Sequence, residues 1–164
     1  MHASHLLPYF SRGLTLLVLA WVLALCQGCT NNISNADIKP ISLIEVREAL
    51  ASGKEKEILI VDARSSKAFA EGHIPGAVNI SIATVSEREL TRDKRIEAYQ
   101  LLAVYGDDPG SPAAQAMTKR FMILGYDDVR MFMDGLAAWK RAGLAVEKGG
   151  VGALPVPAAP GAKP

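Results

Sequence analysis

The side chains that carry most protein chemistry are scarce in this chain. Its 164 residues include three His and two Cys, and His2, His5 and Cys26 fall within the first 28 residues. His73 and Cys29 are the remaining pair. One His and one Cys cannot form a disulfide or a Cys/His zinc site, and a Cys–His dyad would be confined to the terminus. We therefore expect no metal and no cofactor.

Residues 1–28 have the pattern of a secretory leader. A segment without acidic residues ends at Arg12, and residues 13–26 form an uninterrupted apolar run. Such a run fits the hydrophobic region of a signal peptide, about 7–15 residues long, and is short for a membrane span of about 20.

The end of this leader, Leu25-Cys26-Gln27-Gly28-Cys29, resembles the lipobox of bacterial lipoproteins. By that resemblance Cys29 is the lipid-modified first residue of the mature chain. The expected location is the bacterial cell envelope, with the domain held on a membrane by this lipid and facing the extracytoplasmic side. Two alternatives are a Cys-x-x-Cys redox motif and an uncleaved membrane anchor.

Composition divides the rest of the chain into three parts. Residues 29–39 are polar and indicate a flexible tether, and residues 149–164 are rich in Gly, Ala and Pro, which predicts a disordered tail. Residues 40–148 are long enough for one folded domain. The formal net charge of +1 gives no reason to expect nucleic acid as a partner.

Strand-like and helix-like segments alternate within this domain. Short apolar runs predict strands at 58–61, 78–80, 101–105 and 129–133. Helices are predicted from the capping box Ser42/Glu45 to Gly53, from Ser65 or Ser66 to Phe69, in part of 86–99, from Pro112 to Gly125, and over 136–142. This order predicts an α/β fold, a doubly wound parallel sheet of about five strands flanked by helices.

The loop after the strand at 101–105 is the best candidate for a ligand-binding site. It comprises Gly106, Asp107, Asp108, Pro109, Gly110 and Ser111. Ligands of open parallel sheets bind beyond the carboxyl ends of the strands, and the helix that follows offers a positive dipole end. The two adjacent carboxylates would, however, repel an anion. A solvated turn is the alternative interpretation.

Two longer segments resemble the rhodanese family. The first is Ile60-Val61-Asp62-Ala63-Arg64, then Phe69, then Gly72-His73-Ile74-Pro75-Gly76-Ala77-Val78-Asn79-Ile80. The second comprises Gly125-Tyr126, Val129, Asp134-Gly135, Trp139 and Gly143. The resemblance extends over about residues 41–146 and implies the rhodanese-like α/β fold.

Rhodaneses are sulfurtransferases, and the resemblance implies where their chemistry would lie. A cysteine directly after the strand at 101–105 takes up a sulfane sulfur as a persulfide and passes it to an acceptor. That position is Gly106 here, and the frequent loop arginine of the family falls on Gly110 or Ser111. No catalytic residue is therefore expected. Asp62, Arg64 and His73 belong to the structural signature, with Arg64 expected to pair with a buried acid and His73 to act as a hydrogen-bonding brace.

Two hypotheses for function follow. The first is a catalytically inactive rhodanese-like domain that binds or scaffolds a protein partner in the envelope. The alternative is a thiosulfate-type sulfurtransferase acting with a thiol supplied by a partner. A phosphatase is a weaker third hypothesis, because phosphatases of this fold also need the loop cysteine.

Overall fold

A computed structural model describes residues 33–52, 57–82, 92–150 and 154. The expectations for the leader, for Cys29, for residues 86–91 and for most of the tail fall outside these residues. Within them, no helix is long and apolar enough to cross a membrane.

The described residues form a five-stranded sheet in which every pairing is parallel. Its order is β1-β5-β4-β2-β3, so β4 lies at the centre. The strands are β1 (Lys39–Ile41), β2 (Ile58–Asp62), β3 (Val78–Asn79), β4 (Leu101–Tyr105) and β5 (Val129–Phe132). The predicted fold class is confirmed.

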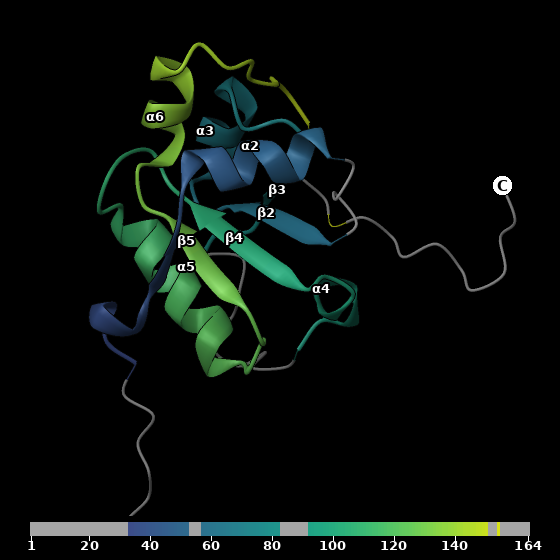
Figure 1. Ribbon diagram of the computed structural model, residues 1–164, viewed down its shortest axis with the longest axis vertical. Coiled ribbons are helices and arrows are strands. Elements are labelled where there is room, and N and C mark those ends of the chain that lie inside the picture. Colours follow the sequence, from purple (N-terminus) through teal and green to yellow (C-terminus); the bar gives the residue numbers. More distant parts are fainter. Residues whose placement is uncertain (1–32, 53–56, 83–91, 151–153, 155–164) are drawn as a thin grey trace, which may run out of the picture. The chain divides into compact units, whose positions relative to one another are not determined.

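Helices cover both faces of the sheet (Figure 1). They are the 3-10 helix η1 (Asn35–Asp37), α2 (Leu43–Ala51), α3 (Ser66–Glu71), α4 (Lys94–Glu97), α5 (Pro112–Ile123) and α6 (Gly135–Arg141). Side chains of α2, α3 and α6 share one hydrophobic cluster, and those of α4 and α5 share the other. The sheet is therefore doubly wound, as the alternation of elements predicts.

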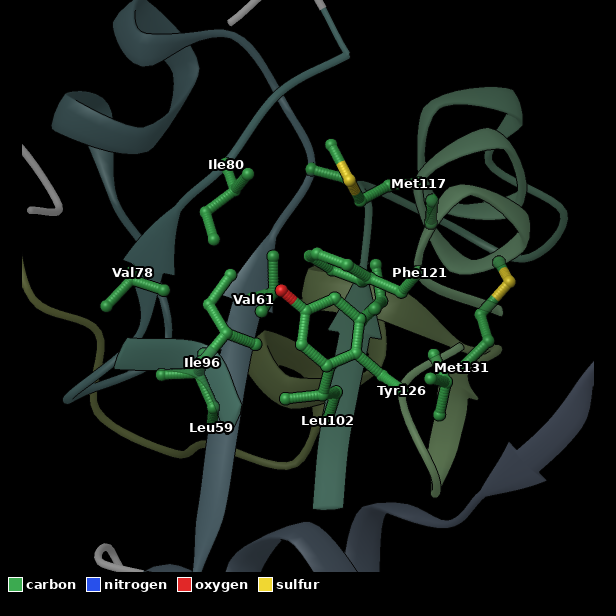
Figure 2. Packing of buried hydrophobic residues seen from close by; sticks show 14 residues of the cluster. Leu59, Val61, Val78, Ile80, Ile96, Leu102, Met117, Phe121, Tyr126 and Met131 are labelled. Atoms are coloured by element: carbon green, nitrogen blue, oxygen red, sulfur yellow. The ribbon is translucent and has the colours of Figure 1, made fainter. Parts of the chain in front are cut away.

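Successive residues of the central strands enter opposite clusters. In β4, Leu102 and Val104 pack with α5, whereas Ala103 and Tyr105 pack on the face of α2, α3 and α6. Figure 2 shows the α5 side, where the ring of Phe121 meets Tyr126 edge-on with centroids 5.5 Å apart. Burial on both faces explains why these strands are uniformly apolar in sequence.

The amino-terminal boundary of the domain differs from the sequence prediction. The sequence predicts a flexible tether over residues 29–39. In the structure, however, Asn35–Asp37 form η1, and Lys39 pairs with Arg130 of β5. Only Ile41 is buried in this edge strand. Three residues with one buried side chain show no alternation, so the sequence gives no signal for β1.

Capping fixes the start of α2 as the sequence predicts. The Ser42 hydroxyl accepts a hydrogen bond from the Glu45 amide at 3.2 Å, and the Glu45 carboxylate accepts from the Ser42 amide at 2.8 Å. The Ser42 hydroxyl also donates to this carboxylate at 2.7 Å, and its hydrogen bond, followed by that from the Ser42 amide, lowers the pKa of Glu45. The capping box thereby directs the chain from the end of β1 back across the sheet.

Candidate functional site

The candidate loop lies at the carboxyl edge of the sheet, directly after the central strand. β4 ends at Tyr105, Gly106–Ser111 follow, and α5 begins at Pro112. The neighbouring strands β2 and β5 end at Asp62 and Phe132, so their following turns flank this loop. This is the position where open parallel sheets bind ligands.

Two carbonyls of the loop are bonded to the start of α6. The carbonyl oxygen of Gly106 accepts from the Leu136 amide at 2.9 Å, and that of Asp107 accepts from the Ala137 amide at 2.8 Å. Gly135 permits this approach, because it has φ +62° and a Cβ on it would lie 2.8 Å from the Gly106 oxygen. The turn after β5 thus holds the loop in place.

Most amides of the loop have no hydrogen-bond acceptor within the described part of the chain. Within the described part of the chain, the amides of Asp107, Asp108 and Gly110 donate no hydrogen bond, whereas the Ser111 amide donates to the Asp108 carbonyl at 3.2 Å. Free amides would suit an anion, but the side chains of the same loop include two carboxylates. The backbone and the side chains of the loop therefore favour ligands of opposite charge.

The guanidinium of Arg64 occupies the space between β2 and this loop. Its Nε and Nη2 donate to the Asp62 carboxylate at 2.7–3.1 Å, and Nη2 also donates to the Gly72 carbonyl at 2.7 Å. Nη1 reaches Asp107 at 3.0 Å. Asp62 is fully buried and Arg64 is 7% exposed. One side chain thus joins β2, the end of α3 and the candidate loop.

The surroundings of Arg64 and Tyr105 shift the pKa of both groups. Burial opposes the charged form of Arg64, but its hydrogen bonds to Asp62 and the charge of Asp62 outweigh burial and raise its pKa above the ordinary value. Beside it, burial and the charge of Asp62 raise the pKa of Tyr105, whose hydroxyl accepts from the Ile74 amide at 3.1 Å. Tyr105 is therefore a neutral structural group.

The sequence does not predict the ion pair between Asp107 and Arg64. The sequence indicates only a carboxylate that repels anions or a solvated turn residue, whereas Asp107 contacts a residue 43 positions earlier in the chain. No local pattern signals a contact over that separation. Its side chain remains 68% exposed, so the ion pair lies at the surface end of the cluster.

His73 lies in a separate set of contacts. Its Nδ1 is 2.9 Å from the Phe69 carbonyl, its Nε2 is 3.5 Å from the Glu147 carboxylate, and its ring stacks on Phe69. The backbone of His73 also pairs with Glu147 in an antiparallel bridge. These contacts tie the segment after α6 to the domain and leave the ring with no role at the loop.

The side chains at the loop offer no activated nucleophile. Gly106 has no side chain, and the two cysteines of the sequence, Cys26 and Cys29, lie outside the described residues. Among the described residues, no histidine can accept the proton of the Ser111 hydroxyl, because the ring of His73 bonds elsewhere. No group of three or more potential metal ligands occurs among the described residues.

Comparison with known proteins assigns the domain. A family model described as a rhodanese-like domain matches residues 42–142. The HTH-type transcriptional regulator Rv0324 of Mycobacterium tuberculosis is 33% identical over 121 residues, which cover 71% of this chain and 50% of that protein. The chain thus spans half the length of this relative.

Solved structures show the same fold. The BH2092 protein from Bacillus halodurans superposes with a TM-score of 0.59 at 22% identity, covering 87% of this chain and 90% of that one. A thiosulfate sulfurtransferase from Pseudomonas aeruginosa superposes with a TM-score of 0.55 at 26% identity, covering 68% of this chain and 20% of that one.

Replacing Arg64 with methionine tests the dependence of the carboxyl edge on the ion pair. We expect the free energy of unfolding to fall by about 3–5 kcal/mol, because Asp62 would be left as an uncompensated buried charge. Chemical denaturation measures the loss.

Arg130→Met is the matched control, since Arg130 pairs with Asp128 at 2.8 Å and its side chain is 33% exposed. We expect this variant to change stability by at most about 1 kcal/mol. Equal losses in the two variants would contradict the structural role assigned to Arg64.

Proposed function

Since this chain belongs to the rhodanese-like domain family, we propose that it retains the family's fold without its sulfur-transfer chemistry and acts as a membrane-anchored binding module. Proteins similar to this domain include a thiosulfate sulfurtransferase, so the proposal is that this chain lacks that activity. The glycine at position 106 is the observation that carries it.

Sulfur transfer from thiosulfate needs a thiolate at the end of β4. The thiolate attacks the outer sulfur, a new S–S bond forms, the S–S bond of thiosulfate breaks, and sulfite leaves. Gly106 supplies no such group. The carboxylates of Asp107 and the exposed Asp108 also oppose the approach of a dianion to this loop.

The same loop is the surface through which we propose that the domain binds a protein partner. Asp108 and Asp134 are exposed, and the side chain of Asp107 is 68% exposed. The loop is also held by α6 and Arg64, so it presents a fixed conformation at the ligand-binding edge of the sheet. A fixed surface lowers the entropic cost of association.

Attachment to the membrane is the second part of the proposal. It rests on the leader of residues 1–28 and on the likeness of Gly28-Cys29 to a lipobox. A lipid on Cys29 would hold the domain at the extracytoplasmic side of a bacterial membrane. The partner in this proposal is accordingly a protein of the cell envelope.

Site-specific photo-crosslinking in cells tests the binding surface. With a photoreactive residue in place of Asp108, we expect a discrete covalent adduct with an envelope protein, because the loop contacts the partner. The matched control places it at Ile123, which is 52% exposed at the far end of α5. Adducts of equal yield at both positions, or none at Asp108, would contradict the assignment.

Replacing Cys29 with alanine tests the anchor. We expect the protein to lose its lipid and to move from the membrane fraction to the soluble fraction, as measured by fractionation and by intact mass. Cys26→Ala is the control and should leave the lipid in place. A Cys29→Ala protein that still carries acyl groups would refute lipid attachment at this residue.

A further inference from the structure

Ser111 is a buried polar residue at the junction of the candidate loop and α5. Only 6% of it is exposed, although it belongs to a surface loop. Its amide donates to the Asp108 carbonyl at 3.2 Å, and its carbonyl accepts from the Gln115 amide at 3.0 Å. Both backbone groups are thus held, which fixes the position of the Ser111 Cβ.

Helix capping does not explain this serine. A serine at the N-cap ordinarily accepts a hydrogen bond from an amide two or three residues later. Ser111 occupies the N-cap position of α5 with φ −45° and ψ 115°, yet its side chain makes no capping hydrogen bond. The N-cap serines of α2 and α3, Ser42 and Ser65, both make one. The Ser111 side chain therefore has no capping role and occupies another position.

That position is the space beside Gly106. A Cβ placed on Gly106 would overlap both Oγ and Cβ of Ser111 and would lie 3.4 Å from Cβ of Ala114. The backbone of Gly106 does not itself require glycine, because Gly106 is not among the glycines with positive φ. Volume, and not the φ angle, excludes a side chain at position 106.

We propose that Ser111 closes the nucleophile position of this site, so that positions 106 and 111 form a steric pair in which only one side chain fits. This inference rests on the proposed function. It names Ser111 as the residue that prevents a nucleophilic side chain at position 106. A cysteine restored at position 106 alone would meet the Ser111 side chain, and the loop would have to move to accept it. In the present loop conformation, a thiol at position 106 therefore requires a smaller residue at position 111.

A double-mutant cycle measures this steric pair directly. Gly106→Ala adds a Cβ, and we expect overpacking to raise the equilibrium constant for unfolding roughly tenfold or more. Ser111→Gly removes the overlapping atoms and should restore most of that loss in the double variant. The control combines Gly106→Ala with Ser65→Gly and should show additive effects, because Ser65 caps a different helix.

Thiol accessibility gives a second measurement. In Gly106→Cys/Ser111→Gly we expect a folded protein whose new thiol at position 106, located by peptide mapping, reacts with iodoacetamide. Gly106→Cys alone should be less stable than this double variant. Additive effects in the cycle, with the two cysteine variants equally stable, would overturn the role of Ser111.

The measurements distinguish a failure of this inference from a failure of the proposed function. Sulfur transfer by the unchanged protein would overturn the proposed function and leave the coupling between positions 106 and 111 intact. Absence of coupling would overturn only the assignment of Ser111, since the unchanged protein would still lack a thiol at the loop.

Discussion

The guanidinium of Arg64 donates hydrogen bonds to three separate segments at the carboxyl edge of the sheet: to Asp62 at the end of β2, to the Gly72 carbonyl after α3, and to Asp107 in the loop after β4. Because Asp62 is fully buried, its charge requires this partner. The ion pair is thus a constraint on the whole edge. It positions the candidate loop through Asp107 and needs no contribution from the side chain at position 106.

Backbone hydrogen bonds hold the loop independently of its side chains. Gly135 and the first amides of α6 hold the carbonyls of Gly106 and Asp107, a contact that depends on backbone atoms alone. These backbone contacts place no requirement on the side chain at position 107. Ser111 fills the space beside Gly106, and the carboxylates of Asp107 and Asp108 are exposed on the same loop.

Much of the fold was predictable because its signals are local. β2 and β4 are buried on both faces and read as continuous apolar runs, and the Ser42/Glu45 box marks the start of α2. β1 was not predictable, since an edge strand of three residues contains one buried side chain. The rhodanese-like signature was informative because residues such as Arg64 and His73 make the contacts that hold the fold together.

The candidate site was predictable in position but not in its contacts. The rule for parallel sheets places it after the central strand, and the sequence shows that a glycine, Gly106, directly follows that strand. The ion pair between Asp107 and Arg64 spans 43 positions, and the direction of the Ser111 side chain depends on how the whole loop packs against α5. Neither follows from residue types or spacing.

Transfer of sulfur from thiosulfate to cyanide by the purified protein tests the central claim most directly. An active thiosulfate sulfurtransferase measured alongside shows that the assay detects thiocyanate. We predict that thiocyanate forms no faster with this protein than in a blank without protein, because Gly106, the residue that follows β4, carries no thiol. Turnover above the blank would contradict the account and would require a nucleophile other than the residue at position 106.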